Sequence, residues 1–491
     1  MPLDIEQFRK AGYEAIDQIC DLYSKIEDRD VKAKVEPGYL RRLLPAHAPE
    51  QGEDFQAITK DYQDFIVPGL TIWQHPSFFA YFPTANTFEG MLGDLYSTST
   101  ANPGFNWNAS PACTELEAIV MDWSAKLFGL DEIFYNEKGI GGGVLQTTAS
   151  DSALVALVAA RSLYTRTHPD VDLSKLIIYT TTQTHSFGKK AALILGLQDR
   201  ALEVTAEDEF SLRGSTLRAA LEEDKQAGLH PFILIATIGT TSSGAIDNLP
   251  EICEVAQEHP SLWIHVDAAW AGVVLACPEL RSACHLDEIN RFANSFCVNF
   301  HKWGLVNFDC SAMWVRDRKH LTDTLDITPE FLRSKHGDEG TVIDYRNWHL
   351  SLGRRFRSLK VWFVLRSFGI KGFQEHIRKG IALNEHFANL VRACEELSLV
   401  TAPSFALSVF QVRAQEHVAD KAAAQNALTQ KLYEILDARN DISITKTLLN
   451  GVLSIRFAVG AVRTEERHID YAFQLIQEQA KNVISNHNLG A

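Results

Sequence analysis

The feature that most constrains the fold is an alternation of short apolar runs with helical segments between residues 176 and 316. The runs at 176–179, 232–238 and 262–266 are rich in β-branched and aromatic residues, as buried strands are. Helical periodicity fills the gaps between them, for example at 217–226. This alternation predicts an α/β domain whose central sheet is mostly parallel.

Polar side chains stand at the points where four of the predicted strands end. These side chains are His185, Thr241, Asp267 and Lys302. In open α/β sheets, ligands bind at the carboxyl ends of the strands. Four polar groups at four strand ends are much less likely to be a coincidence than one, so we expect them to share a ligand site.

The run 295–303 reads as a short apolar strand that ends on Lys302. This lysine stands between the imidazole of His301 and the indole of Trp303. Poor solvation disfavours an ammonium, so the pKa of this lysine should fall. A neutral amine at that depth is what a Schiff base with an aldehyde needs. The alternative interpretation is a lysine whose ammonium reaches solvent from a strand end.

A Gly/Thr/Ser loop at 141–150 leads into a predicted helix at 151–162. Such a loop presents free N–H groups and hydroxyls to an anion, and Thr148, Ala149 and Ser150 stand closest to the helix. No Gly-Lys-Ser/Thr follows, so this is not a Walker loop. The loop fits a phosphate held without a metal, although serine at a helix N-cap is common for structural reasons alone.

Taken together, these groups point to a phosphorylated aldehyde with a basic ring nitrogen, which is pyridoxal phosphate. Asp267 would pair with the protonated ring nitrogen and keep the ring an electron sink. His185 would stack on the ring and could handle protons. The structural alternatives are a helix N-cap for Asp267 and a hydrogen-bonded core histidine for His185. The combination favours the cofactor.

The rest of the chain divides into three predicted regions: an N-terminal helical dimerisation segment at 1–80, a large cofactor-binding domain at 81–370 and a small C-terminal α+β domain at 371–491. Two amphipathic N-terminal helices cannot bury their apolar stripes against each other alone, so we expect them to pack on another body such as a second subunit. A long polar connection at 322–342 has the length typical of a lid or a disordered segment.

The charge and cysteine content exclude several classes of function. The net charge of −15, from 62 acidic and 47 basic residues, argues against nucleic acid and anionic membranes as partners. The longest apolar run, at 153–160, is far too short to span a bilayer. Eight scattered cysteines without a CxxC pair, together with an N-terminus that has no signal-peptide pattern, predict reduced thiols in a cytoplasmic protein.

Several long motifs resemble one family, the aromatic L-amino-acid decarboxylases, which are fold-type-I, group II pyridoxal phosphate enzymes. They lie at 73–84 (WQHPSFFAYFPT), 110–121 (SPACTELEAIVM), 265–271 (HVDAAWA), 301–316 (HKWGLVNFDCSAMWVR) and 344–364. The resemblance runs in register over nearly the whole chain. It implies an obligate homodimer with an interlocking N-terminal segment and an active site at the subunit interface.

The resemblance also implies roles for individual residues. Phe300 departs from the family's usual proline before the His-Lys pair, and only a local backbone change is expected from it. The implied catalytic residues are Lys302, His185, Asp267 and Phe331; the cofactor-binding residues are Thr148, Ala149, Ser150, His185, Thr241, Asp267, Asn299, His301 and Lys302; the substrate-binding residues are Trp73, Tyr81, Phe82, Thr84, Phe105 and Gly353. No metal ligands are expected.

Two positions bear on substrate and product. Gly353 matches a site where glycine accompanies indolic substrates in plant relatives and serine accompanies phenolic ones, although animal relatives with glycine also take dopa. Phe331, in the polar connection, stands where the family's decarboxylases have a tyrosine whose hydroxyl is thought to protonate the substrate carbon after CO2 leaves. Phenylalanine cannot donate this proton, as in relatives called aromatic aldehyde synthases, where O2 then leads to an aldehyde, NH3 and H2O2.

Three other functions compete with this expectation. Another group, such as His185 or water, could supply the proton and give a plain decarboxylase that releases an arylalkylamine. A decarboxylase of acidic amino acids is less favoured, because the chain has an aromatic wall and no basic pocket motif. A catalytically silent binding protein with the same fold is the distant alternative, and the intact Lys302, Asp267 and His185 count against it.

Overall fold

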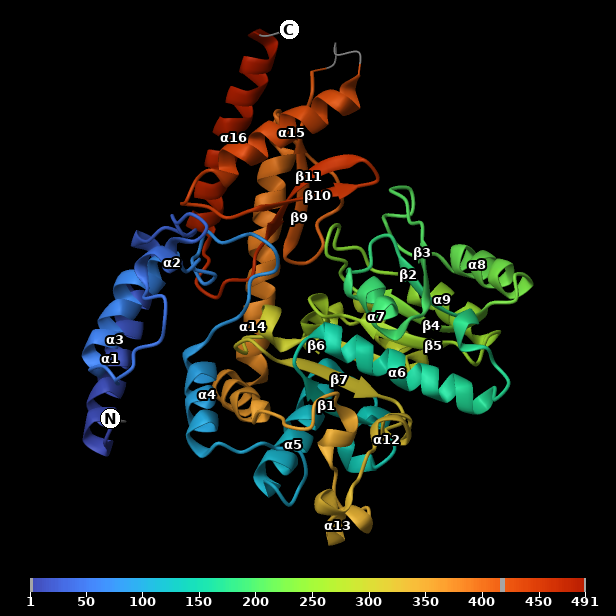
Figure 1. Cartoon of the computed structure of the whole chain (residues 1–491). Helices are drawn as coiled ribbons and strands as arrows, with labels where there is room; N and C mark the ends of the chain where they lie inside the picture. Colours follow the sequence, from blue (N-terminus) through green and yellow to red (C-terminus); the bar gives the residue numbers. More distant parts are fainter. Residues whose placement is uncertain (1–2, 416–419, 490–491) are drawn as a thin grey trace.

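The structure is a computed structural model, and it describes residues 3–415 and 420–489. Figure 1 shows three regions: a group of N-terminal helices, a large sheet with helices on both faces, and a small sheet with its own helices near the C-terminus. The long helix α14 (Arg357–Arg392) runs between the large and small sheets. This arrangement confirms the predicted α/β class with a helical N-terminus and a small C-terminal α+β unit.

The large sheet has seven strands in the order β1-β7-β6-β5-β4-β2-β3. Only β7 runs antiparallel to its two neighbours, and the other four pairs are parallel, so the sheet is mostly parallel as expected. The strands are β1 (Gly142–Gln146), β2 (Leu176–Thr181), β3 (Gln198–Leu202), β4 (His230–Thr237), β5 (Trp263–Asp267), β6 (Ser295–Asn299) and β7 (Ser311–Val315).

Helices cover both faces of this sheet, which explains why central strands such as β5 and β6 are buried at every residue rather than at alternate ones. Neighbouring residues such as Cys297 and Val298 point into two different hydrophobic clusters. One face packs against α6 (Ala149–Thr167), α7 (Phe187–Leu195) and α12 (Lys319–Leu325). The other face packs against α5 (Pro111–Phe128), α8 (Gly214–Gln226), α9 (Leu249–Gln257) and α10 (Leu286–Phe292).

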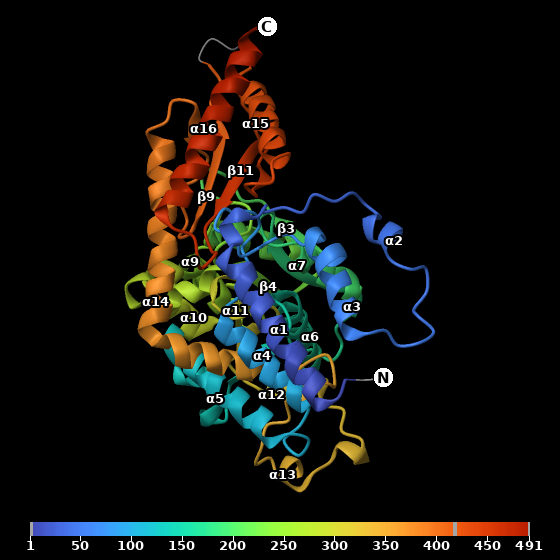
Figure 2. The same cartoon turned by 90° about the vertical axis from the view of Figure 1, so that its left-hand side faces the viewer.

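The N-terminal helices are attached to the large domain by few buried contacts. Asp4 and Gln7 form a capping box at the start of α1 (Ile5–Ser24). The Tyr23 ring packs edge-on against Phe88 of α4 (Phe88–Thr100), at 5.1 Å between centroids. Figure 2 shows α1 and α4 from the side on which the N-terminal helices lie. The other N-terminal helices are α2 (Tyr39–Leu43) and α3 (Phe55–Asp61).

The small domain is built on an antiparallel sheet in the order β10-β11-β9-β8. The aromatic segment that precedes the large domain runs along this sheet, since the Phe79 N–H donates to the Ser443 carbonyl and the Phe79 carbonyl accepts from Ala458. The elements are β8 (Leu397–Leu399), β9 (Leu407–Val412), β10 (Thr445–Leu449), β11 (Val452–Ala458), α15 (Lys421–Asp437) and α16 (Glu466–Leu489). The sequence predicts a helix near 419–438, and α15 occupies most of this range, whereas residue 419 lies outside the described residues.

Three local expectations differ from the structure. The predicted loop at 141–150 contains strand β1, because pairing with β7 outweighs the low strand propensity of its two glycines. The run at 295–303 ends as a strand at Asn299, and a single helical turn, α11 (Phe300–Trp303), carries the lysine. The polar connection at 322–342 contains short helical turns, among them Glu330–Leu332 and α13 (Lys335–Asp338).

Helix α14 contains a kink at Gly369, whose φ of 64° lies in the left-handed region that glycine tolerates. This kink is close to the predicted boundary between residues 370 and 371, but the three domain ranges remain a prediction. Among the described residues, no helix combines the length and apolarity needed to cross a membrane.

Candidate active site

A cavity of about 200 Å³ lies at the carboxyl ends of the parallel strands. All nine residues predicted to bind the cofactor line it: Thr148, Ala149, Ser150, His185, Thr241, Asp267, Asn299, His301 and Lys302. They come from five separate stretches of the chain. The fold therefore brings together the polar groups that the sequence placed at the strand ends.

Lys302 enters this cavity from α11, the single turn that follows β6. Its Nζ lies 5.3 Å from the centroid of the Phe82 ring and makes no hydrogen bond or ion pair within the described residues. Burial lowers the pKa of this amine, and the negative charge of Asp267 opposes that effect. An amine that is withdrawn from water and has no partner is poised to act as a nucleophile.

Asp267 ends β5 and presents one carboxylate oxygen to the protein and the other to the cavity. Its Oδ1 accepts hydrogen bonds from the Ala269 N–H at 3.0 Å and from the Cys297 thiol at 3.7 Å. Its Oδ2 has no hydrogen-bond partner among residues 3–415 and 420–489. A protonated ring nitrogen is the kind of group that such an oxygen can accept from.

His185 follows β2 and precedes α7. Its Nδ1 accepts the Phe187 N–H at 3.3 Å, which assigns the hydrogen of the neutral ring to Nε2. Burial on the cavity side lowers the pKa of this imidazole, and the nearby Lys302 cation lowers it further. The ring is therefore neutral at pH 7, with one N–H to donate.

The other end of the cavity carries hydrogen-bond donors suited to an anion. Thr148 caps α6 and forms a capping box with Asp151, while the N–H groups of Ala149 and Ser150 have no partner within the described part of the chain. His301 Nδ1 accepts the Cys310 N–H at 2.8 Å, so Nε2 carries the hydrogen. Burial lowers the pKa of His301 to about 3, which keeps that ring neutral. A helix N-terminus with two free amides and a nearby N–H is a fitting phosphate site.

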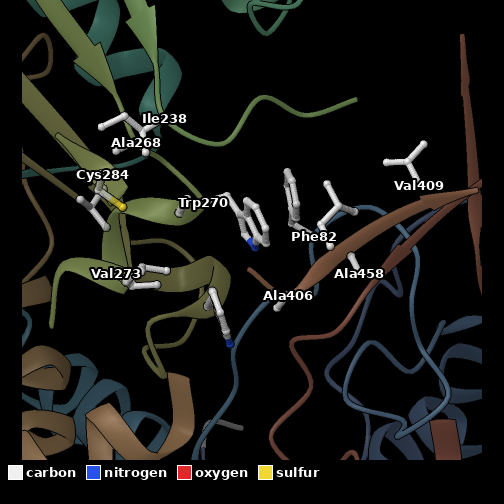
Figure 3. Close-up of a cluster of buried hydrophobic side chains, with 14 of the residues drawn as sticks. Phe82, Ile238, Ala268, Trp270, Val273, Cys284, Ala406, Val409 and Ala458 are labelled. Carbon is white, nitrogen blue, oxygen red and sulfur yellow. The ribbon is translucent and has the colours of Figure 1, made fainter. Parts of the chain in front are cut away.

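Aromatic rings form one wall of the cavity. Phe82 stacks on Trp270 with ring centroids 4.5 Å apart and planes inclined by 15°. Figure 3 shows these two rings side by side, close to Ala406 and Ala458 of the small domain. The wall therefore lies where the large and small domains meet, and it suits a flat ligand.

Arg456 is a candidate that the sequence analysis missed. It lies on β11, is only 4% exposed, and its guanidinium carbon is 4.7 Å from the centroid of Phe82. Its Nε and Nη2 are buried without a hydrogen-bond partner, and burial lowers its pKa to about 10. Its Nη1 donates to Thr445 Oγ1 at 3.2 Å. A buried cation with two unbonded nitrogens beside the aromatic wall is suited to an anionic ligand. The signal in the sequence was an arginine inside the mostly apolar strand run at 452–457.

Five of the six predicted substrate-binding residues do not line the cavity of the single described protomer. Phe82 lines it, whereas Trp73 and Tyr81 stack on each other at 5.5 Å nearer to the surface. Thr84 is partly buried, and its carbonyl accepts a hydrogen bond from Gln74. Phe105 and Gly353 lie on two neighbouring segments.

These two segments are joined to each other and to the core. The Gly104 N–H donates to the Arg354 carbonyl at 3.0 Å, and Arg354 forms a buried ion pair with Glu117 at 2.6 Å. A Cβ added at Gly353 would meet no atom within 4 Å. Phe331, the predicted product-determining residue, is 80% exposed on the turn Glu330–Leu332. Phe105 is half-buried and Gly353 and Phe331 are exposed, and none of the three lines the cavity that contains Lys302.

Comparison with known proteins agrees with this site. Residues 37–413 match the pyridoxal-dependent decarboxylase conserved domain. The chain is 43% identical over 491 residues to the aromatic-L-amino-acid decarboxylase of Bos taurus, with 98% of each chain covered. It is 42% identical over 486 residues to the phenylacetaldehyde synthase of Arabidopsis thaliana, again with 98% of each covered.

A solved structure shows the same fold throughout. The structure of Oryza sativa TDC with PLP and tryptamine superposes with a TM-score of 0.95 at 36% identity, and 99% of each chain is covered. The chain thus belongs to the pyridoxal-dependent decarboxylases, in the group of aromatic amino acid decarboxylases and aromatic aldehyde synthases, and its cofactor is pyridoxal phosphate.

Proposed function

We propose that this enzyme decarboxylates aromatic L-amino acids, with a preference for indolic ones, and carries the reaction on to an aryl acetaldehyde. The observation that supports the chemistry most directly is the cavity itself. It joins the unpartnered amine of Lys302, the free Oδ2 of Asp267 and the free amides of α6. The combination of these three groups is specific to a site for a phosphorylated aldehyde that carries a ring nitrogen.

The residues present fit pyridoxal phosphate in three ways. The Lys302 amine would hold its aldehyde carbon covalently, and Asp267 Oδ2 would accept the proton of its ring nitrogen. The amides of Ala149 and Ser150, the Nε2–H of His301, and the side chains of Thr148, Asn299 and Thr241 would surround the phosphate. His185 would stack on the ring.

When bound, the cofactor supplies an electron sink for the electron pair that remains when the substrate carboxylate leaves as CO2. The protein must orient that carboxylate, exclude water and decide where the next proton comes from. Thr84 is the residue that we assign to the carboxylate from the family resemblance. We add Arg456, since its guanidinium is buried beside Phe82 with Nε and Nη2 free of hydrogen bonds.

The product depends on whether a proton reaches the carbon that has lost CO2. The Phe331 side chain has no proton to give, in contrast to a tyrosine hydroxyl. Without protonation, the electron-rich carbon reduces O2 to H2O2, and water hydrolyses the product. The balanced reaction is amino acid + O2 + H2O → aldehyde + CO2 + NH3 + H2O2. The similarity to a phenylacetaldehyde synthase supports this outcome.

The second candidate function is plain decarboxylation to the arylalkylamine. His185 favours it, because its neutral ring carries an N–H at Nε2 on the cavity. If that hydrogen reaches the substrate carbon, the amine forms without oxygen. The similarity to aromatic-L-amino-acid decarboxylases is equally consistent with this outcome.

Substrate selection should depend on open space near Gly353. The absence of a side chain there leaves room for an indole, and the similar rice protein was solved with tryptamine. Trp73, Tyr81, Phe82 and Phe105 would provide the aromatic surroundings. The reaction would take place in the cytoplasm, and the eight unbridged thiols suit a reducing compartment.

We further propose that the active enzyme is a homodimer. In one protomer Phe105, Gly353 and Phe331 are apart from the lysine cavity, so a complete substrate pocket would need Phe105 of the partner subunit and the partner's Phe331. Large exposed apolar side chains on α1, α4 and α5 provide a surface for such an interface.

The experiment that tests the product measures O2 uptake, H2O2 and CO2 during turnover of tryptophan, tyrosine and dopa, with products identified by mass. We expect one H2O2 per CO2 together with aldehyde, fastest with tryptophan. The Phe331→Tyr variant should shift the products towards amine and lower H2O2 per CO2 at least tenfold, because its hydroxyl supplies the missing proton.

Other outcomes of this experiment are equally informative. Amine without oxygen uptake in the unaltered enzyme would establish the plain decarboxylase and refute a product-determining role for Phe331. The silent binding protein predicts no CO2 at all. In that case borohydride treatment of the protein with pyridoxal phosphate, followed by peptide mapping, would show whether Lys302 holds the cofactor.

A further inference from the structure

A row of buried polar side chains lies beneath the cavity on two adjacent strands. The parallel register of β5 and β6 pairs His265 with Ser295 and Asp267 with Cys297. Since alternate residues of a strand share a face, these four side chains and that of Trp263 point to the same side of the sheet. All five residues are at most 4% exposed.

Hydrogen bonds connect the five side chains in one direction. The Trp263 Nε1–H donates to Ser295 Oγ at 2.8 Å, and Ser295 Oγ lies 2.7 Å from His265 Nδ1. The Ser295 hydroxyl has no other acceptor in the described part of the chain, which assigns its hydrogen to Nδ1 of His265. The ring hydrogen of His265 is then on Nε2, which faces the Cys297 sulfur at 3.7 Å.

The last hydrogen bond of this network is made to Asp267, in the proposed catalytic site. With the His265 N–H directed at its sulfur, the Cys297 thiol is left to donate to Asp267 Oδ1, at 3.7 Å. Burial lowers the pKa of His265 to about 4 and raises the pKa of the Cys297 thiol well above its ordinary value. Both groups are therefore neutral at pH 7, and the thiol keeps the hydrogen that it donates.

We propose that Cys297, held by His265, is a positioning residue that fixes the Asp267 carboxylate with Oδ2 turned towards the cofactor's ring nitrogen. The inference rests on the proposed function, because it takes Asp267 as the partner of that nitrogen. Each hydrogen bond to Oδ1 limits rotation of the carboxylate. Loss of the thiol hydrogen should therefore weaken cofactor binding, although Cys297 is not among the residues that line the cavity.

The test compares Cys297→Ala with Cys297→Ser, two variants that differ by one hydroxyl. The cofactor-free proteins are titrated with pyridoxal phosphate, and the dissociation constant and the visible absorption maximum of the complex are measured. We expect about fivefold to tenfold weaker binding and a displaced maximum for Cys297→Ala. Cys297→Ser keeps a donor, so its dissociation constant should lie within about twofold of that of the unaltered protein, and its absorption maximum should return to the unaltered position.

A purely structural role for Cys297 predicts a different order. Both variants are smaller than cysteine, so a packing defect would affect Cys297→Ser as much as Cys297→Ala, and that result would overturn the proposal. Binding by Cys297→Ala equal to that of the unaltered protein would also overturn it. Circular dichroism checks folding, and Cys297→Val, which has no donor but fills the space, replaces Cys297→Ala if the latter does not fold.

The role of His265 is tested by coupling. His265→Phe keeps an aromatic ring but removes both nitrogens, so on its own it should weaken cofactor binding by about twofold to fivefold. Because His265 acts through the thiol, adding His265→Phe to Cys297→Ala should cause little further loss. If the loss of cofactor affinity in the double variant equals the product of the two single losses, the two residues act separately.

The failure of this inference can be told apart from failure of the proposed function. If the unaltered protein binds no pyridoxal phosphate and borohydride fixes none on Lys302, then the proposed function itself fails. If the unaltered protein binds and is fixed on Lys302 while the Cys297 variants bind equally well, then only the positioning role fails.

Discussion

At the scale of single residues, Lys302 carries an energetic cost in the protein without cofactor. Its amine is withdrawn from water, and within the described residues no hydrogen bond or ion pair compensates it. A residue kept for chemistry rather than for stability is expected to behave in this way. The cost should appear as a dependence of stability on pH.

We predict that Lys302→Met raises the unfolding temperature of the cofactor-free protein at pH 7 by about 1–3 °C. The reason is that methionine has a similar length and apolar character but no amine to desolvate. The measurement is thermal unfolding at a fixed scan rate, with Lys371→Met, on the exposed surface of α14, as the matched control. An unchanged or lower unfolding temperature for Lys302→Met would contradict the prediction.

The pH dependence of this effect has a definite sign. The folded-state pKa of Lys302 is lowered, so the unfolded chain binds more protons than the folded protein between the two pKa values. The stability of the unaltered protein should therefore rise with pH through that window. The advantage of Lys302→Met should be largest below the folded pKa and should disappear above about pH 10.4, the ordinary pKa of lysine.

At the scale of secondary structure, helix α6 holds the phosphate end of the proposed site through its cap. Thr148 and Asp151 bond each other's backbone, which fixes the first turn and the two amides that face the cavity. If this cap is lost, the first turn frays and the amides lose their common direction.

We predict that Thr148→Val weakens pyridoxal phosphate binding about fivefold, since loss of an N-cap hydroxyl costs about 1 kcal/mol. Thr148→Ser keeps the hydroxyl and serves as the control. Binding of pyridoxal, which lacks the phosphate, should change less than twofold in both variants. Equal losses for pyridoxal and pyridoxal phosphate would mean that the cap supports the whole cavity rather than its anion end.

Most of this site could be predicted from the sequence because it depends on where strands end. A polar residue directly after an apolar run is visible without a structure, which is why His185, Asp267 and Lys302 were identified and were found around one cavity. The family resemblance added Asn299 and His301, which no local pattern distinguishes from neighbouring residues.

What the sequence did not predict depends on contacts between distant segments. Strand β1 forms because β7 pairs with it, and β7 lies about 170 residues further along the chain. Arg456 reaches the aromatic wall only because the small domain packs on Phe82. The connection between Cys297 and Asp267 likewise requires the register of two strands, which the separate runs do not specify.

At the scale of the whole molecule, helix α4 exposes more apolar surface than is expected of a monomer in water. Leu92, Leu95 and Tyr96 are each between 44% and 57% exposed on this helix. Exposed Phe8 and Tyr13 on α1 and Trp123 on α5 add to the apolar surface. A second copy of the chain would remove this surface from water and bring the partner's Phe331 into use.

We predict that Leu95→Glu converts the proposed dimer to a monomer that still binds pyridoxal phosphate but turns over substrate at least tenfold more slowly. A buried carboxylate without a partner opposes association, whereas the lysine cavity is formed within one protomer. The measurement is sedimentation velocity with cofactor absorbance. Leu173→Glu, at a leucine of similar exposure (51%), is the control and should remain dimeric.

The two free amides at the start of α6 affect how the sequence of this enzyme can evolve. Every amino acid except proline brings the same N–H group, so substitutions at the exposed position 150 can leave that part of phosphate recognition unaltered. Under the proposed assignment, cofactor dependence is a property of the backbone path. Substitutions of side chains in the substrate pocket could therefore change the substrate many times during evolution, while the enzyme still requires the same vitamin-derived cofactor.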